Sequence, residues 1–318
     1  MFAKSYQALK ALLFRTIRFD LDRIPYEFKD LPLRKLVNWL LTETSVIFKP
    51  ARPWGFPTLL QVEPTNHCNL RCTGCPVTSG MDRPKGMMDL NLYKRVIDEL
   101  REYLLLIMLW DWGEPFLHPD AYEMIRYASR SGIEVLASTN GNIFCEGDHA
   151  RNVVESGLDV LVFSVDGITQ ETYSKYRNMG ELQKVLEGIK RVVAEKKRQS
   201  SKIPLINFRF IAMKHNEDEM PLLQGFAESL NVDALTIRKF REWGNQNDLV
   251  PEAEGYQLPS PSSDESLSHL KNNPCKRLWN CPTIHWNGSV CPCFVDYSEA
   301  TPLGVIGSAS FKDIWYGE

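Results

Sequence analysis

Short apolar runs alternate with amphipathic patterns along the middle of this 318-residue chain. Between the runs, apolar residues recur every three or four positions, as at Leu92, Val96 and Leu100, which is typical of helices that bury one face. The runs themselves are short and mostly apolar, so they suit strands buried on both faces of a sheet. This alternation predicts the α/β class, with a parallel sheet covered by helices. The six predicted strands span residues 58–62, 104–110, 134–138, 160–165, 206–211 and 234–238.

The first 56 residues lack this alternation and predict a helical segment instead. An amphipathic helix is expected near the start, where basic and apolar residues interleave. Such a helix could bind a membrane surface or a partner, or it could lie across the edge of the strand–helix domain. We favour the second interpretation. The apolar positions of this pattern are Leu9, Leu12, Leu13 and Ile17, with Lys10, Arg15 and Arg18 between them.

Composition divides the remaining chain into three parts. Residues 57–245 hold the alternating strands and helices and predict the main domain. Residues 246–270 are rich in proline, serine and acidic residues, which indicates a linker or a covering loop. Residues 271–318 hold a second group of cysteines and predict a small cysteine-rich domain.

Charge and cysteine usage exclude several classes of protein. The formal net charge of −3 gives no general reason to expect nucleic-acid binding, which normally demands a basic face. The chain has eight cysteines but no pattern of a secretory signal peptide, so we expect free thiols in a reducing cytoplasm. No uncharged run approaches the roughly 20 residues that cross a bilayer, so we expect no transmembrane segment.

Three cysteines lie on one short loop after the first predicted strand. Residues 63–76 read EPTNHCNLRCTGCP and place three residues between Cys68 and Cys72 and two between Cys72 and Cys75. Thiols this close converge more readily on one metal centre than on each other as disulfides. An iron–sulfur cluster suits a set of thiolates alone, whereas zinc sites usually show two C-x2-C pairs. Three ligands on a 4Fe–4S cluster leave one iron open to a substrate or cofactor.

Four motifs follow four consecutive strands in order: the cysteine loop, WGEP, STNG and SVDG. In this order they resemble the radical S-adenosylmethionine (radical SAM) superfamily, over roughly residues 57–239. The resemblance implies a partial (β/α)6 TIM-like barrel with its site at the carboxyl ends of the strands. It also implies a catalytic 4Fe–4S cluster that binds S-adenosylmethionine, and an electron donor such as flavodoxin or ferredoxin.

The resemblance also implies roles for several residues. Gly113 and Glu114 match the part of the family's GGEP motif that meets the methionine amino group, while Trp112 replaces the first glycine. Arg177 matches by position an arginine that pairs with the methionine carboxylate, although a surface arginine is the alternative. Arg209 is a second candidate for that carboxylate, because its strand would point it into the barrel.

Further cofactor contacts are implied by position. Polar groups at the strand ends suit the ribose hydroxyls and the methionine carboxylate, although any of them could instead cap a helix. The residue before the third cysteine is usually an aromatic that packs on adenine, but here it is Gly74, so Ile211 becomes the candidate for that contact. The polar strand-end candidates are Ser138, Asn140, Ser164 and Asp166.

The second group of cysteines resembles the SPASM and twitch domains, which bind auxiliary iron–sulfur clusters. Twelve residues separate Cys275 from Gly288 and four separate Gly288 from Cys293, which fits their C-x(9–15)-G-x4-C signature. Cys281 and Cys291 could complete an auxiliary 4Fe–4S site. The alternatives are a site short of ligands, a degenerate site, or zinc bound by the same four thiols. Cys145 reads as an ordinary loop thiol.

These patterns together predict an enzyme that reductively cleaves S-adenosylmethionine and abstracts hydrogen from a small molecule or sugar, an oxidoreductase-like reaction. A maturase acting on a ribosomal peptide is one alternative. A non-catalytic iron–sulfur or zinc scaffold is another, but a scaffold does not need polar groups at four strand ends. Asp111 and Glu242, each after a strand, are candidates for a general base by position alone.

Overall fold

Six parallel strands form the centre of the computed structural model, which describes residues 11–21, 23–243, 247–258 and 275–317. Each predicted strand is present, which confirms the α/β class and the partial (β/α)6 barrel. Consecutive strands along the chain are neighbours in the sheet, all paired in parallel. The strands are β3 (Leu59–Val62), β4 (Leu106–Leu109), β5 (Glu134–Thr139), β6 (Val160–Ser164), β7 (Leu205–Ala212) and β8 (Ala234–Lys239).

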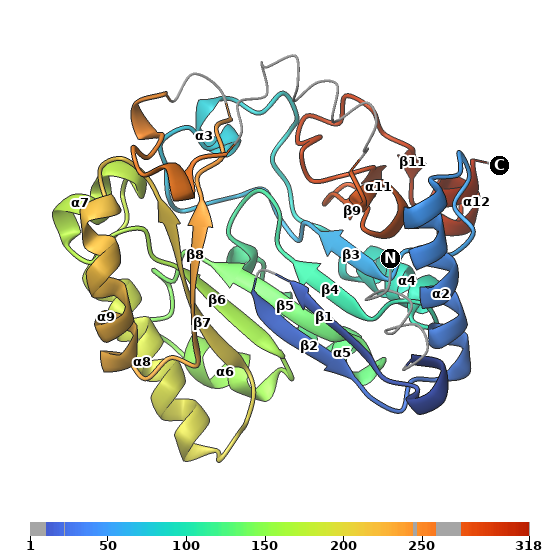
Figure 1. The fold of residues 1–318 in the computed structure, drawn as a ribbon, viewed down its shortest axis with the longest axis horizontal. Coiled ribbons are helices and arrows are strands. Elements are labelled where there is room, and N and C mark those ends of the chain that lie inside the picture. Colours follow the sequence, from blue (N-terminus) through green and yellow to red (C-terminus); the bar gives the residue numbers. More distant parts are fainter. Residues whose placement is uncertain (1–10, 22, 244–246, 259–274, 318) are drawn as a thin grey trace.

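Helices cover the outer face of this sheet (Figure 1). Alternate strand residues separate the two faces: Ile107 and Leu109 pack with the helices, whereas Leu106 and Met108 belong to a second core on the inner face. The short helices α6 and α7 were not predicted, because one or two turns show too little periodicity. The covering helices are α4 (Leu90–Leu100), α5 (Ala121–Arg130), α6 (His149–Glu155), α7 (Gln170–Tyr176), α8 (Leu182–Arg198) and α9 (Leu223–Ser229).

A β-hairpin packs on the inner face of the barrel, where the sequence predicted an amphipathic helix. Its strands are β1 (Ile17–Leu21) and β2 (Ile24–Phe28). The prediction was wrong at Ile17, because Ile17, Phe19 and Leu21 follow the period of two that suits a strand. Residues 11–14 are helical, and Leu9 lies outside the described residues. Ile24 and Tyr26 are buried in the same core as Leu106 and Met108.

Helix α2 (Leu33–Phe48) follows the hairpin and lies at the edge of the molecule (Figure 1). Of the predicted linker, the described residues 247–258 contain two short 3₁₀ turns, η3 (Asn247–Leu249) and η4 (Glu254–Tyr256). The predicted start of the last domain at residue 271 lies outside the described residues, so this boundary stays a prediction.

The cysteine-rich segment extends the barrel sheet. Strand β9 pairs in parallel with β3, which places Thr283 beside Gln61, and the sheet continues through β10 to β11. Trp315 is buried and donates a hydrogen bond from Nε1 to the carbonyl oxygen of Gly55 at 3.0 Å, which fastens the last helix to the start of the barrel. The elements are α11 (Arg277–Asn280), β9 (Thr283–Ile284), β10 (Ser289–Cys291), β11 (Gly304–Val305) and α12 (Phe311–Tyr316).

The hairpin should contribute to the stability of the barrel as part of its core. Ile24 is 2% exposed, so Ile24→Ala should lower the free energy of unfolding by about 2–5 kcal/mol. Ile47→Ala is the matched control, because Ile47 is 49% exposed; its change should stay within about 0.5 kcal/mol. Urea denaturation measures both. Equal effects of the two variants would mean that the hairpin is not part of the cooperative core.

Candidate active site

A cavity of about 240 Å³ opens at the carboxyl ends of the barrel strands. Residues of the cysteine loop and of the WGEP, STNG and SVDG motifs line it together. Asp166 does not line it and lies behind Arg177. The predicted residues that line the cavity are Cys68, Cys72, Cys75, Gly113, Glu114, Ser138, Asn140, Ser164, Arg177, Arg209 and Ile211.

The cysteine loop is held by backbone hydrogen bonds to the end of α7. The amide of Arg71 donates to the carbonyl oxygen of Asn178 at 3.0 Å, and that of Thr73 donates to Tyr176 at 2.9 Å. Gly74 has φ +72°, a left-handed conformation that favours glycine. The loop geometry therefore accounts for a glycine where the family usually has an aromatic residue.

The three thiols suit a cluster of positive iron ions. Burial raises the pKa of Cys68 to about 12 and that of Cys75 to about 11, and it also raises the pKa of Cys72. Thiols in such a site stay protonated unless a bound cation compensates for the lost hydration. Three converging sulfur ligands on one loop therefore fit a 4Fe–4S cluster.

Gly113 occupies a position that no other residue can take without strain. Its φ is +124°, and a Cβ atom there would lie 2.4 Å from the carbonyl oxygen of Thr65. The strand-end turn is thus packed directly against the start of the cysteine loop. The amide of Glu114 also donates to the carbonyl oxygen of His67 at 2.8 Å. Trp112 and Gly113 therefore present their backbone at the edge of the cavity.

The side chain of Glu114 joins two strand ends. Its carboxylate accepts hydrogen bonds from the hydroxyl of Thr139 at 2.8 Å and from the amide of Asn140 at 2.7 Å. Burial raises the pKa of Glu114 to about 7. The side chain of Asn140 in turn donates to Oδ1 of Asn69 at 2.7 Å, so the STNG motif also contacts the cysteine loop.

Asp166 and Arg177 form a buried ion pair. Nε and Nη2 of Arg177 both lie 2.6 Å from Oδ2 of Asp166, while Nη1 lies 3.7 Å from the sulfur of Cys72. The other carboxylate oxygen of Asp166 accepts from the amide of Ile211 at 2.8 Å. Both oxygens of Asp166 thus have partners inside the protein, and its predicted contact with the cofactor stays a prediction.

Arg209 points into the barrel, as its place on the strand predicted. It is 5% exposed, its Nη1 lies 3.4 Å from Oγ of Ser138, and its guanidinium lies 5.9 Å from the ring centroid of Trp110. Oγ of Ser138 lies 3.3 Å from that of Ser164. Arg238 on β8 also lines the cavity and was missed. The sequence signal was weaker there, because Arg238 lies between Ile237 and Lys239, whereas Arg209 lies between two phenylalanines.

A buried ionic network lies between the barrel and the last segment. Arg83 binds both carboxylate oxygens of Glu63, one of them from Nη1 at 2.7 Å. Nε2 of His285 lies 3.4 Å from Oδ2 of Asp111, and Nδ1 of His285 lies 3.0 Å from Oε1 of Glu299. Burial alone would lower the pKa of His285, but Asp111, Cys291 and Glu63 together raise it to about 10.

The contacts of this network bear on whether its carboxylates bind a metal ion and whether Asp111 acts as a general base. Ligand-type atoms of Glu63, Asp111 and His285 lie within 4.8 Å of one another, a spacing that could hold a metal ion. Because Glu63 is already neutralised by Arg83 and the imidazolium neutralises Asp111, ion pairs account for the group. Asp111 thus belongs to this ionic network, and burial raises its pKa to about 7. Glu242, the other predicted base, is exposed.

Two of the distal cysteines have side-chain contacts that separate them. Burial raises the pKa of Cys281 to about 12, although Nη1 of Arg277 lies 3.7 Å from its sulfur and opposes the shift. The sulfur of Cys291 instead lies 3.8 Å from Nδ1 of His285 and 4.0 Å from Oγ of Ser289. Cys275, Cys281 and Cys293 thus stay the candidate ligands of an auxiliary cluster. The predicted fourth ligand, Cys291, points to the ionic network in this conformation.

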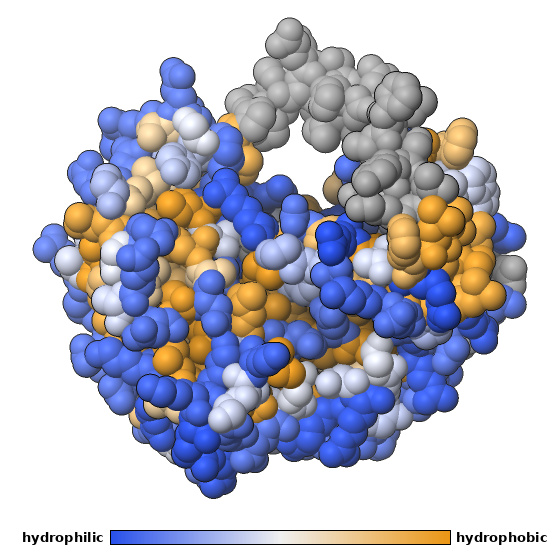
Figure 2. Space-filling model, turned by 60° about the horizontal axis from the view of Figure 1, so that its bottom comes forward, coloured by the Kyte–Doolittle hydropathy of each residue, from blue (hydrophilic) through white to orange (hydrophobic). Residues whose placement is uncertain are grey.

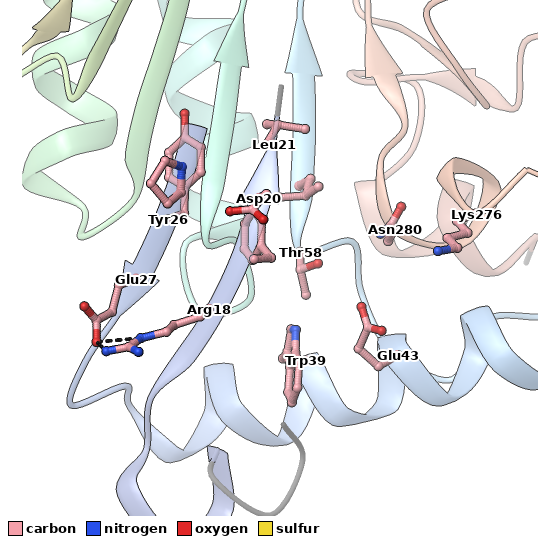
Figure 3. Close-up of a pocket in the computed structure, with 13 residues that line it drawn as sticks. Arg18, Asp20, Leu21, Tyr26, Glu27, Trp39, Glu43, Thr58, Lys276 and Asn280 are labelled. Atoms are coloured by element: carbon pink, nitrogen blue, oxygen red, sulfur yellow. Dashed lines mark hydrogen bonds and ion pairs between the residues drawn. The ribbon is translucent and has the colours of Figure 1, made fainter. Parts of the chain in front are cut away.

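A second cavity of about 730 Å³ lies at the opposite ends of the strands, between the hairpin, α2 and α11. Trp39 and Thr58 border it, and Arg18 forms an ion pair with Glu27 at its rim (Figure 3). None of its lining residues is a cysteine or a predicted cofactor ligand. The cavity with the three thiols is therefore the candidate active site.

Comparison with known proteins agrees with this barrel and its site. The model of the radical SAM superfamily matches residues 62–219, and that of the SPASM iron–sulfur cluster-binding domain matches residues 275–318. The chain therefore belongs to the radical SAM superfamily of enzymes and carries a SPASM domain. Its cofactors are the 4Fe–4S cluster and S-adenosylmethionine of the first domain, and the second implies auxiliary iron–sulfur binding.

Several curated proteins are similar in sequence. The tungsten-containing aldehyde ferredoxin oxidoreductase cofactor-modifying protein of Pyrococcus furiosus is 26% identical over 294 residues, which covers 81% of each chain. The AdoMet-dependent heme synthase of Methanosarcina barkeri is 32% identical over 42% of this chain and 38% of that protein. The mycofactocin maturase MftC of Mycobacterium tuberculosis is 30% identical over 43% and 35%. This chain thus spans only about a third of the last two.

Solved structures share the fold at low sequence identity. Streptococcus suis SuiB bound to S-adenosylmethionine has a TM-score of 0.66 at 13% identity, covering 91% of this chain and 72% of SuiB. Native anSMEcpe with bound AdoMet has a TM-score of 0.57 at 16% identity, covering 81% and 80%. Within the described residues, no helix combines the length and apolar character that crossing a membrane requires.

The close approach at Gly113 should make it indispensable for cofactor binding. Gly113→Ala forces a Cβ against Thr65 and adds about 1–3 kcal/mol of backbone strain, so binding of S-adenosylmethionine should weaken at least about fivefold. Gly132→Ala is the matched control, since Gly132 also has positive φ (+72°) but a Cβ there meets nothing within 4 Å. Equilibrium dialysis measures both variants. Wild-type binding by Gly113→Ala would contradict the assigned geometry.

Proposed function

We propose that this protein cleaves S-adenosylmethionine reductively and abstracts a hydrogen atom from a small-molecule or sugar substrate. The observation that carries the proposal is the single cavity in which the three thiols meet the ends of four strands. A scaffold that only holds a cluster would not need a buried arginine and paired serines beside it. Cys68, Cys72 and Cys75 would hold the cluster, and S-adenosylmethionine bound there would supply the radical chemistry.

The chain's own residues would bind and orient the cofactor. Backbone oxygens of the turn at Trp112 and Gly113 suit the methionine ammonium. Arg209 suits its carboxylate better than Arg177 does, because Arg177 directs its guanidinium to Asp166 and Cys72. Arg177 would instead stabilise the thiolate of Cys72 and so fix the cluster.

The remaining polar residues would contact the nucleoside part of the cofactor. Ser138 and Ser164 present adjacent hydroxyls at the cavity and suit the ribose. Ile211 gives the adenine an apolar contact in place of the aromatic that Gly74 removes. The aromatic side chains of Trp110 and Trp112 border the same cavity and would exclude water from the radical.

A small-molecule substrate is supported by the Pyrococcus furiosus relative, because the alignment covers 81% of both chains. The Pyrococcus furiosus protein, which this chain covers over 81% of its length, is named for modifying a cofactor. The heme synthase also carries a small-molecule product in its name. A peptide substrate is the second candidate, supported by the fold shared with SuiB, which has been solved with its precursor peptide SuiA.

The cysteine loop supplies the first test of this proposal. The wild type, reconstituted without oxygen and reduced with dithionite, should convert S-adenosylmethionine to methionine and 5′-deoxyadenosine, slowly when no substrate is present. Replacing Cys68, Cys72 and Cys75 together by alanine should remove one cluster and abolish this product. Cys145→Ala, a thiol on another loop, should leave iron content and product unchanged. Full iron in the triple variant, or no product from the loaded wild type, would support the scaffold alternative.

The distal thiols supply a second, separate test. The fully reconstituted wild type should contain about eight irons, the sum of two 4Fe–4S clusters. Replacing Cys275 and Cys293 by alanine should lower this to about four while cleavage of S-adenosylmethionine persists, because the catalytic cluster has its own loop. Cys291→Ala should keep about eight irons, because Cys291 points to His285. A wild type with about four irons and no zinc would mean that the distal segment holds no metal.

A further inference from the structure

Helix α2 buries several of its polar side chains against the rest of the protein. Lys35, Asn38, Thr42 and Ser45 are each at most 7% exposed. Each has a partner inside: Nζ of Lys35 donates to the carbonyl oxygen of Gly132 at 2.6 Å, and Oγ1 of Thr42 donates to that of Phe56 at 2.8 Å. These hydrogen bonds fix the rotation of the helix about its axis.

The opposite side of α2 is apolar and exposed. Leu33, Val37 and Leu41 recur every four residues along it and are 69%, 46% and 40% exposed. Phe48 is 69% exposed, and its ring lies 5.7 Å from that of Trp54. We call these five residues, together with Ile47, the α2 face. Hydrophobic surface gathers at the right side of the molecule in Figure 2, where α2 lies in Figure 1.

A helical turn before the hairpin continues this surface. Leu12, Leu13 and Phe14 are 56%, 65% and 65% exposed. The amide of Leu31 donates to the carbonyl oxygen of Arg15 at 3.1 Å, so this turn lies beside the start of α2. Single exposed apolar residues are ordinary on a protein surface, whereas exposed apolar residues that gather on one face mark an interaction site.

The charge of the surrounding segment indicates what the patch contacts. Among the described residues of the first 56, apart from the buried Lys35, there are seven lysines and arginines against four aspartates and glutamates, a net charge of +3 in a chain whose net charge is −3. An isologous contact between two copies of this chain would bring the two basic segments together, which is unfavourable. An anionic surface that also accepts apolar side chains satisfies both features, and a lipid bilayer with acidic headgroups is such a surface.

We propose that the α2 face docks the protein on anionic membrane surfaces. The helix would lie in the plane of the headgroups with its apolar side chains inserted, while the buried polar side holds the barrel beneath it. Such peripheral binding needs no membrane-spanning helix. It is independent of the reaction proposed for the active site.

Vesicle cosedimentation of the reconstituted full chain tests this proposal. The probes are vesicles of phosphatidylcholine alone and of phosphatidylcholine mixed with phosphatidylglycerol. The wild type should bind the mixed vesicles at least about tenfold more tightly than the neutral ones, and high salt should weaken the binding. The double variant Leu33→Ser, Phe48→Ser should lose at least about tenfold of this affinity.

Two controls keep the result specific. Leu222→Ser changes a residue that is 59% exposed outside the first 56 residues, and it should bind vesicles like the wild type. Iron content and deoxyadenosine production should be unchanged in the double variant, since its substitutions are on exposed positions. The proposal is overturned if mixed and neutral vesicles bind equally, or if the double variant binds like the wild type. It is also overturned if light scattering shows a wild-type dimer that the double variant separates while neither binds vesicles.

Discussion

The buried ion pair of Glu63 and Arg83 is the constraint on which the rest of the site depends. Their side chains are 0% and 4% exposed, so neither charge is solvated by water. Breaking such a pair by removing one partner typically costs about 3–5 kcal/mol, because it leaves a buried charge without compensation. Glu63 ends the first barrel strand and Arg83 follows the cysteine loop. The pair therefore closes that loop at its base.

The same arginine joins the barrel to the SPASM domain. Nε of Arg83 donates to the carbonyl oxygen of Tyr297 at 2.6 Å, and Nη1 lies 3.6 Å from Oε1 of Glu299. Glu299 in turn contacts His285, whose other ring nitrogen faces Asp111 beside the WGEP turn. The cysteine loop, the second strand end and the SPASM domain thus share one set of compensated charges. The parallel pairing of β9 with β3 gives the same connection through the backbone.

The barrel and most of its cavity could be predicted from sequence because both follow from local patterns. Apolar runs of four to eight residues identified the strands, and the geometry of parallel sheets then placed each following motif at one end. The roles of individual side chains could not be predicted this way. Asp166 ends a strand as a cofactor ligand would, yet it binds Arg177 and Ile211. Which partner a buried carboxylate takes depends on residues distant in sequence.

The first 56 residues show two further limits of sequence patterns, the competition between periodicities and the burial of polar groups. At Ile17 a period of two gave a strand where interleaved basic residues suggested a helix. In α2 the sequence alone does not show that Asn38 and Thr42 face inward, since their burial depends on the backbone of Phe56. The hydrophobic pattern of a helix therefore misleads about its inner face when polar side chains on that face bond to distant backbone groups.

The departures from the family motif at Gly74 and Trp112 each follow from the local backbone geometry. The left-handed conformation before the third cysteine requires Gly74 and so removes an aromatic side chain from the cavity. In the WGEP turn, the positive φ and the close approach fall on Gly113, so the preceding position is free to carry a large side chain. Trp112 donates from Nε1 to the carbonyl oxygen of Phe294 at 3.0 Å, and its ring lies 4.9 Å from that of Trp243. The SPASM domain thus holds Trp112 in place at the edge of the cavity.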